Sequence, residues 1–516
     1  MNQSPLITIL TLVPFFGAIV VVGLGHERKS LARGLSLAFS LAALAIALAM
    51  WFQFNPNSGE IQFHARYDWI PGLGVAYNVG VDGLGLLMVL LTGLVVPMAI
   101  LASWRTEDRA QIYFSLVLFL QAGLFGTFTA LNFVHWFLFW ELSLIPAFFL
   151  VRLWGGPQRA AAATQFFVYT MVGSIALLLS FLAIFLVTRD FDFSAIAQMA
   201  QRGELIPALS LKVNWYSLTG LGTVVFVCAC LGFAVKVPLM PFHTWLPATY
   251  AEAPTGTTML LTGLMSKMGV YGFLRILVPI FPDQIHALRT PLLVLAIITI
   301  VFSACAAFAQ KDLKRMLAYS SINHLGYCLL GVFAVVTTGD AVPAPATEKA
   351  AALNGVFLQL FNHGLTAATL FWFLSLLEKR SGGLLGVNDF GGLRKVAPVF
   401  CGLMGIALFS SLGLPGLNGF VGEFLIFKGV FPLASCSASV SVIGLLVTAI
   451  FILTLLQKVF NGPLNEKWSA LPDLTLGERL LLAPSIALMF ILGICPQLVL
   501  GAVNSTVMKM VDQLKF

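Results

Sequence analysis

Long apolar segments follow one another along almost the whole chain, separated by short polar connections. About 20 apolar residues are enough for a helix to cross a bilayer. Fourteen segments approach or exceed that length, at 4–24, 31–53, 82–103, 111–131, 133–152, 164–187, 218–237, 256–278, 291–309, 316–337, 351–377, 397–433, 440–460 and 480–502. Uninterrupted runs of this kind exclude the alternating pattern of barrel strands. The pattern predicts an all-α membrane protein with 14 transmembrane helices.

The composition agrees with a membrane protein that has no soluble domain. Of the 516 residues, 59% are hydrophobic and 10% charged, whereas a soluble domain has about 25% charged residues. The polar stretches 54–80 and 188–216 are interpreted as loops, because they are too short for a domain. The chain has no GxGxxG or Walker motif and no CxxC pair, so nucleotide binding, ATP-driven transport and iron–sulfur or zinc ligation are not expected.

The basic residues predict how the chain is oriented. The loops after odd-numbered segments contain 17 Lys and Arg residues, and the other side contains 8. Cytoplasmic loops carry the excess of these residues. We therefore expect both termini on the side opposite the cytoplasm. The net charge of +7 reflects this bias and does not indicate nucleic-acid binding.

Two of the predicted helices are interrupted. Three prolines lie within 238–247, after segment 7, and Gly413-Leu-Pro-Gly-Leu-Asn-Gly419 divides segment 12. Broken helices at matching places in two halves are typical of inverted-repeat transporters and of their binding sites. We expect two inverted five-helix repeats, helices 4–8 and 9–13. The expected units are 1–110 for helices 1–3, 111–278 for the first repeat, 291–460 for the second repeat, and 480–516 for helix 14.

Ionisable residues inside the apolar segments are the strongest functional signal. Glu141, Lys236, Lys267 and Glu423 lie within these segments or at their edges. A charged Asp, Lys or Arg at a membrane helix centre costs about 2.5–3.5 kcal/mol on insertion scales, so such groups are functional by default. The alternative is a carboxyl or ammonium group that only pairs with a structural partner.

A proton relay is the function that these residues favour. Glu141 and Lys236 are expected to alternate between an ion pair and a separated, proton-releasing lysine, with Lys267 as a deeper relay group. His324 and His363 add imidazoles, whose ordinary pKa lies near 7. Glu423 is the expected terminal acceptor. His243 and Glu252 are secondary candidates at the cytoplasmic mouth, where structural capping is an equal alternative.

Five motifs contain most of these residues. They are Phe-Trp-Glu141-Leu-Ser-Leu-Ile-Pro, Val-Lys236-Val-Pro-Leu-Met-Pro-Phe-His-Thr-Trp-Leu-Pro, Ala-Glu252-Ala-Pro-Thr, Lys267-Met-Gly-Val-Tyr-Gly-Phe-Leu-Arg275 and Leu-Pro415-Gly-Leu-Asn-Gly-Phe-Val-Gly-Glu423-Phe. They resemble the antiporter-like subunits of proton-pumping NADH:quinone oxidoreductase, respiratory complex I, over essentially the whole chain. Glu423 in place of a lysine, and a chain that ends soon after segment 14, make it similar to subunit M, the chain 4 family.

The resemblance implies roles for the matching residues. Glu141 and Lys236 would form the modulating pair, Lys267 the central relay, His324 the link and Glu423 the periplasmic end. One departure concerns Ala248-Thr249-Tyr250, where the family usually has Asp-Ala-His after Trp-Leu-Pro. Two polar groups are thereby lost near the cytoplasmic mouth, which puts an entry path through them in doubt.

The resemblance also implies partners and cofactors. The partners would be other membrane-arm subunits, similar to L, N and K, together with lipid, and nucleic acid is not expected. No cofactor or metal is expected on this chain, whereas FMN, iron–sulfur clusters and quinone would lie on other subunits. Two alternatives stay open. One is a subunit of an Mrp-type Na⁺/H⁺ antiporter with the same fold, and the other is a scaffold whose buried charges only hold helices together.

Overall fold

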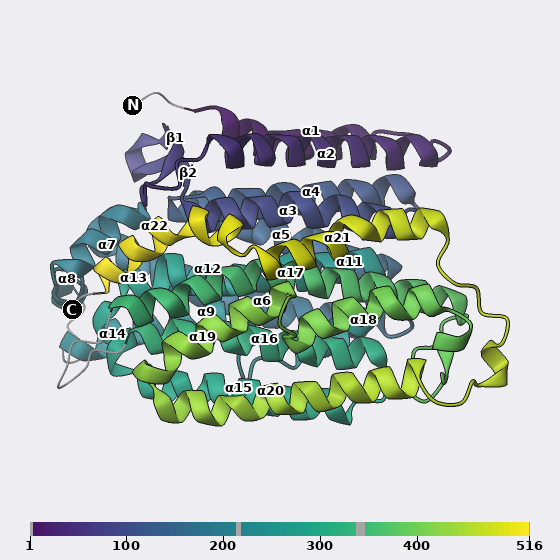
Figure 1. Ribbon diagram of the computed structural model, residues 1–516. Coiled ribbons are helices and arrows are strands. Elements are labelled where there is room, and N and C mark those ends of the chain that lie inside the picture. Colours follow the sequence, from purple (N-terminus) through teal and green to yellow (C-terminus); the bar gives the residue numbers. More distant parts are fainter. Residues whose placement is uncertain (1–3, 213–217, 337–345, 515–516) are drawn as a thin grey trace.

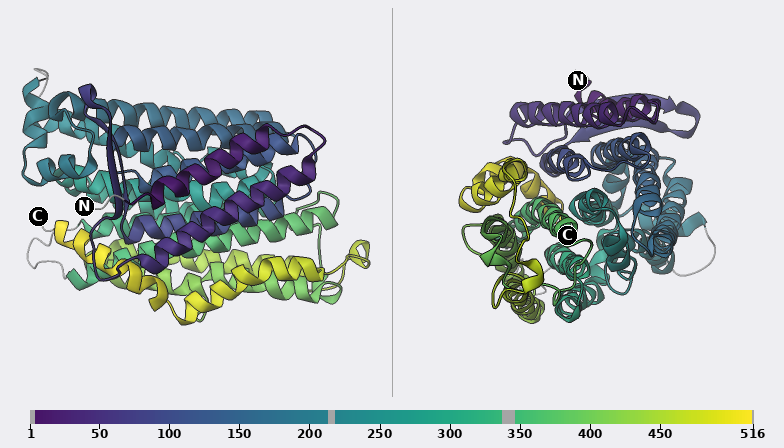
Figure 2. Two further views of the ribbon diagram at one scale, coloured as in Figure 1. Left: turned by 90° about the horizontal axis from the view of Figure 1, so that it is seen from above. Right: turned by 90° about the vertical axis from the view of Figure 1, so that its right-hand side faces the viewer.

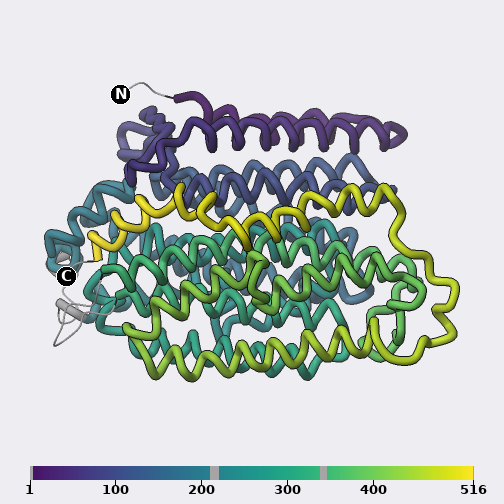
Figure 3. Tube along the Cα trace, viewed as in Figure 1, coloured from purple at the N-terminus to yellow at the C-terminus, as the bar shows by residue number. Residues whose placement is uncertain are grey.

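The computed structural model describes residues 4–212, 218–336 and 346–514. Its helices lie side by side in one elongated bundle (Figure 1), and a view along the bundle shows them nearly end-on (Figure 2). The first and last described residues lie at the same end of the bundle, as the Cα trace makes clear (Figure 3). An even number of crossings, as expected from the sequence, requires this arrangement.

The helices of the N-terminal half follow the predicted segments closely. They are α1 (Leu6–Val22), α2 (Lys29–Gln53), α3 (Gly83–Ala102), α4 (Ala110–Thr129), α5 (Phe133–Trp154), α6 (Arg159–Thr188), α9 (Leu218–Lys236), α10 (Trp245–Glu252), α11 (Thr255–Leu260), α12 (Ser266–Gly272) and α13 (Val278–Ile280). The segments η2 (Leu261–Met265) and η3 (Phe273–Leu277) are π-helical and join α11, α12 and α13 into one continuous span. Such π-helical turns occur frequently at functional sites.

The C-terminal half contains α14 (Pro282–Ala287), α15 (Arg289–Ala309), α16 (Leu313–Val335), α17 (Ala346–Arg380), α18 (Pro398–Leu412), α19 (Asn418–Leu433), α20 (Ser435–Leu455) with the π-helical η5 (Leu456–Phe460), α21 (Leu476–Ile494) and α22 (Gln497–Gln513). In the described part of the chain, ten helices are long and apolar enough to cross a membrane. Each of the fourteen predicted segments coincides with a helix or a broken helix, but fourteen membrane crossings and the inverted repeats remain predictions.

Both predicted breaks are present. Helix α9 ends at Lys236, and an irregular turn with a cis bond before Pro241 leads into α10. Helix α18 ends at Leu412 and is followed by Gly413, which has φ +82°, and α19 begins at Asn418. A third break was not predicted. Segment 480–502 is divided at Cys495–Pro496 into α21 and α22, because a proline removes a helical hydrogen bond and clashes with the preceding turn.

The two polar stretches interpreted as loops contain regular structure, which corrects that interpretation. Strand β1 (Gln62–Ile70) pairs antiparallel with β2 (Val75–Val81), in a register that places Tyr67 opposite Tyr77. The short turn η1 (Pro71–Leu73) joins them. Helices α7 (Phe193–Gln201) and α8 (Leu205–Lys212) occupy the second stretch. The hairpin and these helices lie at the end of the bundle that holds the termini (Figure 1).

Two almost completely buried spans form the centre of the bundle. The span Thr255–Ile280 and the long helix α17 are each 94% buried over their most apolar window. Helix α16, which contacts both spans, is not one of the ten apolar spans, because it carries the polar residues Ser321, Asn323 and His324. Polar side chains therefore run through the middle of an otherwise apolar bundle.

Candidate functional site

The pair formed by His324 and Glu423 lies in the protein interior, at the break between α18 and α19. Nδ1 of His324 is 2.9 Å from Oε1 of Glu423, and both side chains are buried. The contact has the distance of an ion pair but not the alignment of a hydrogen bond. Nε2 of His324 lies 3.0 Å from Oγ of Ser411, and Nε2 of Gln359 donates to Oε1 of Glu423 over 3.2 Å. The structure thus places both predicted residues in one polar cluster.

Glycine at the break lets the carboxylate approach the backbone. A Cβ atom at Gly413 would lie 2.7 Å from Oε2 of Glu423. Glu423, Gly413 and the exposed ring of Phe424 are among the residues that line a lateral groove of about 450 Å³. The carboxylate therefore connects the buried histidine with this opening in the bundle.

A second imidazole extends the cluster toward the centre. The ring centroids of His324 and His363 are 4.9 Å apart, with a 34° angle between the planes. Nε2 of His363 is buried and has no hydrogen-bond partner in the described part of the chain. One turn of α17 away, the hydroxyl of Thr366 lies 3.0 Å from that of Ser410. An unpaired, buried ring nitrogen beside a second histidine is free to accept or donate a proton.

Lys267 is the most deeply buried cation of the cluster, with an exposed fraction of 0%. Its Nζ donates to the carbonyl oxygen of Thr262, which belongs to π-helical η2, and lies 3.4 Å from Oγ of Ser266. The Thr262 hydroxyl is 2.8 Å from that of Ser321 on α16. These contacts connect the lysine with α16, the helix that carries His324.

Lys236 ends α9 and is buried at the first break. Its Nζ lies 4.7 Å from the centroid of the Trp140 ring, which is the neighbour of Glu141 in the chain. Oε1 of Glu141 is buried and has no hydrogen-bond partner among the described residues. Within the described residues, no carboxylate lies within 4.0 Å of the Nζ atom of Lys236 or Lys267. In the described structure Glu141 and Lys236 are therefore not joined by an ion pair, and their pairing stays a prediction.

The two secondary candidates differ. Glu252 ends α10, and its Oε2 accepts from the backbone N–H of Gln158 over 2.9 Å, while its carbonyl accepts from Gly156 over 2.8 Å. These bonds fix the connection between α5 and α6, which is the structural alternative considered for this residue. His243 is buried between the rings of Phe302 and Tyr319, and its Nδ1 has no partner. Neither residue touches the central cluster.

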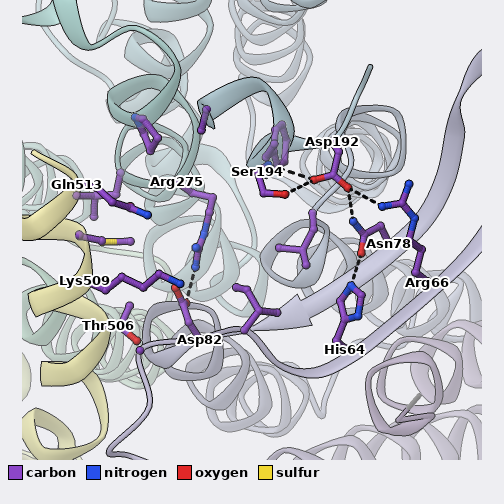
Figure 4. Close-up of a pocket in the computed structure, with 18 residues that line it drawn as sticks. His64, Arg66, Asn78, Asp82, Asp192, Ser194, Arg275, Thr506, Lys509 and Gln513 are labelled. Atoms are coloured by element: carbon purple, nitrogen blue, oxygen red, sulfur yellow. Dashed lines mark hydrogen bonds and ion pairs between the residues drawn. The ribbon is translucent and has the colours of Figure 1, made fainter. Parts of the chain in front are cut away.

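A separate polar cavity lies at the end that holds the termini. It has a volume of about 380 Å³ and is enclosed by the hairpin, α7, η3 and α22 (Figure 4). Arg275 forms a buried ion pair with Asp82, which also caps α3 by accepting from the Gly85 N–H over 3.1 Å. Asn78 connects His64 with Asp192 through bonds of 2.8 and 2.6 Å. The cations of this cavity are paired with carboxylates, which distinguishes them from Lys236 and Lys267.

Several members of the cluster were not found from the sequence. Ser411, Gln359 and Trp140 were missed because serine, glutamine and tryptophan carry no charge to mark them among apolar neighbours. The recorded contacts join His363 with His324 and His324 with Glu423. Among the described residues, no group of three or more His, Cys, Asp or Glu side chains is placed to hold a metal ion.

Comparison with known proteins identifies the family. The family described as "NADH:quinone oxidoreductase/Mrp antiporter, TM" matches residues 130–452. The chain belongs to this family. Subunit M of the F(420)H(2) dehydrogenase of Methanosarcina mazei is 34% identical over 503 residues, with 96% of each chain covered. NADH-quinone oxidoreductase subunit M of Rhodobacter capsulatus is 32% identical, with 98% of this chain and 96% of the relative covered.

A solved structure agrees with this membership. A chain of respiratory complex I from Thermus thermophilus superposes with a TM-score of 0.84 at 27% identity and covers 99% of this chain and 100% of its own length. The Mrp complex from Dietzia contains a chain with a TM-score of 0.82 at 21% identity, covering 99% and 98%, which shows a shared fold. The chain is thus an antiporter-like membrane subunit of the complex I type, as the motifs predicted.

Proposed function

We propose that the chain is a proton-translocating subunit in the membrane arm of a quinone-reducing respiratory complex. It performs no redox chemistry itself. Electron transfer elsewhere in the complex drives protons through its buried residues, with Lys236 and Glu141 on the entry side and Glu423 on the exit side. The names of the two subunit M relatives support the kind of complex. They also leave two electron donors open, NADH and reduced F420.

The observation that carries this proposal is the environment of the Lys267 side chain. A fully buried ammonium group without a carboxylate partner is strongly disfavoured, because desolvation favours the neutral amine. Among the described residues, the hydrogen-bond partners of Lys267 are one carbonyl and one hydroxyl oxygen. An amine in such a site can take its charged or its neutral form, so Lys267 is suited to accept and release a proton. The scaffold alternative instead requires a closed ion pair, such as that of Arg275 and Asp82.

The further steps follow the line of polar groups. A proton on Lys267 passes to the imidazoles of His363 and His324, whose ring centroids are 4.9 Å apart. Contact between His324 and Glu423 over 2.9 Å then carries it to the break between α18 and α19. Water is required between Lys236 and Lys267 and between Lys267 and His363, since no direct bond joins the members of either pair. His243 is assigned to entry, whereas Glu252 supports the loop between α5 and α6.

The topology completes the proposal. Fourteen crossings, two inverted five-helix repeats over 111–278 and 291–460, and flanking units 1–110 and 480–516 place the two breaks in equivalent positions. The termini face the periplasm of a bacterial inner membrane. Membrane-arm subunits similar to L, N and K, with lipid, surround the chain. FMN, iron–sulfur clusters and the quinone site are assigned to other subunits.

A second candidate function is Na⁺/H⁺ exchange in an Mrp-type complex. The matching family covers both kinds of protein, and the chain shares the fold of an Mrp subunit. Both functions would use the same buried residues, so the site does not separate them. The energy source separates the two functions, because an antiporter needs a sodium gradient and no electron donor.

The test uses the native complex reconstituted into liposomes with a pH-sensitive dye. NADH or reduced F420 is added with a soluble quinone, in sodium-free and sodium-containing buffer. We expect one donor to drive proton uptake that an uncoupler abolishes and that does not require sodium. Proton movement that a sodium gradient drives without any donor would instead identify the antiporter.

A further inference from the structure

Trp140 provides the closest recorded contact of the Lys236 ammonium group. The described residues include no hydrogen-bond or ion-pair partner of this ammonium group, and Nζ lies 4.7 Å from the indole centroid. A cation over the face of an aromatic ring is attracted by the ring's quadrupole, most strongly with tryptophan and in a desolvated site. Lys236 and Trp140 are both buried, so this condition is met.

The ring is held rigidly in the orientation that this contact needs. Its Nε1–H donates to Oγ of Ser174 on α6 over 3.0 Å. The ring packs against Trp136 at a centroid distance of 4.7 Å and meets Phe233 of α9 edge-on at 5.9 Å. Three neighbours on three helices thus fix the plane of the indole.

Close packing of two helices brings the lysine to the ring. A Cβ atom at Gly232 of α9 would lie 2.8 Å from the Gly173 carbonyl oxygen of α6. Gly173 precedes Ser174, the partner of the indole, and Gly232 lies one turn before Lys236. A larger residue at either glycine would push α9 away from α6. The glycine contact therefore sets the depth of the lysine relative to the tryptophan.

We propose that Trp140 is a positioning residue that holds the Lys236 cation when it is separated from Glu141. This inference rests on the proposed function and deepens it. The lysine can contact either of two consecutive residues: the carboxylate of Glu141 or the neutral ring face of Trp140. The ammonium group can leave the indole without being separated from an opposite charge. Lys236 therefore releases its proton toward Lys267 more readily from this position than from an ion pair.

The decisive experiment varies the ring's electron density but hardly its shape. Tryptophans carrying one to four fluorine atoms are introduced at position 140 by site-specific incorporation, in the complete complex reconstituted in liposomes. Fluorine withdraws electron density from the ring face and weakens the attraction of a cation. We expect the initial rate of donor-driven proton uptake to fall stepwise with each fluorine, to roughly a tenth in the most substituted ring.

Two controls separate this role from packing. The same series at Trp136, which stacks on Trp140 but does not contact Lys236, should leave proton uptake unchanged. Ser174→Ala removes the acceptor of the indole N–H but keeps the ring and should have a smaller effect than Trp140→Leu. Equal rates across the Trp140 series would overturn the inference. The proposed function would still stand in that case if Lys267→Met abolished proton uptake.

Discussion

Nδ1 of His324 lies 2.9 Å from Oε1 of Glu423, so a residue in the middle of α16 contacts one that follows the break between α18 and α19. These residues are 99 positions apart in the chain. Both side chains are buried. Removing one partner of a buried pair leaves the charge of the other partner uncompensated. The contact connects the inner imidazoles with the groove beside Gly413.

A double substitution tests this contact. Glu423→Gln and His324→Ala should each lower donor-driven proton uptake by about tenfold or more, and the double variant should be little worse than either single variant. Residues that act as one unit are strongly non-additive. The measurement is the initial rate of proton uptake per assembled complex.

The matched control is the pair of Glu348 and Lys428, which are 3.8 Å apart near the surface. Glu348→Gln, Lys428→Met and their combination should leave proton uptake close to that of the native complex. Additive losses for His324 and Glu423 would show that the two residues act independently.

Gly413 offers a test that removes no charge. Alanine at this position must adopt φ +82°, which costs about 1–2 kcal/mol for an L-residue. Its Cβ would also meet Oε2 of Glu423 at 2.7 Å and displace the carboxylate. We expect Gly413→Ala to lower proton uptake several-fold and to lower the thermal midpoint of the complex.

Gly402 supplies the control on the same helix. A Cβ at Gly402 meets nothing within 4 Å, and alanine favours the helix there. Gly402→Ala should retain native proton uptake and stability. Equal behaviour of the two variants would mean that the position of the Glu423 carboxylate is unimportant.

The segment pattern predicted the helices and the breaks well, because both depend on local sequence. Apolar length determines a spanning helix, and Pro and Gly determine where it must be interrupted. Pro496 shows the limit of this reasoning, since it lay near the end of an apolar run and the resulting break was overlooked. The β1–β2 hairpin was missed because its residues 62–70 mix charged and aromatic residues without strict alternation.

The site was predicted as a set of charges but not as a set of contacts. Glu141, Lys236, Lys267, His324 and Glu423 were recognisable because a charge in an apolar run is conspicuous. Which neighbour each of them meets depends on how distant helices pack. The contact of Lys236 with Trp140 and that of His324 with Ser411 are of this kind. No periodicity within one segment specifies them.

The pair of Arg275 and Asp82 should behave as a structural ion pair. Asp82→Asn leaves the Arg275 cation without its carboxylate, and breaking a buried pair in this way costs about 3–5 kcal/mol. We expect a lower yield and thermal midpoint of the complex, but normal proton uptake by each complex that assembles. Asp68→Asn, on the exposed part of β1, is the control and should change neither quantity.

A different outcome at Asp82 would revise the route. If Asp82→Asn assembled in normal yield but no longer translocated protons, the polar cavity of Figure 4 would belong to the proton path. The exit would then lie beside η3 and not at the Glu423 groove.

The most direct test of the central claim is the number of protons taken up per electron in the Lys267→Met variant. Methionine is an unbranched apolar side chain about as long as the alkyl stem of the lysine, but it cannot carry a proton. The reconstituted complex should assemble and transfer electrons, yet lose proton uptake through this subunit, whereas Lys428→Met should match the native ratio. A native ratio in fully assembled Lys267→Met complexes would contradict a relay through this residue.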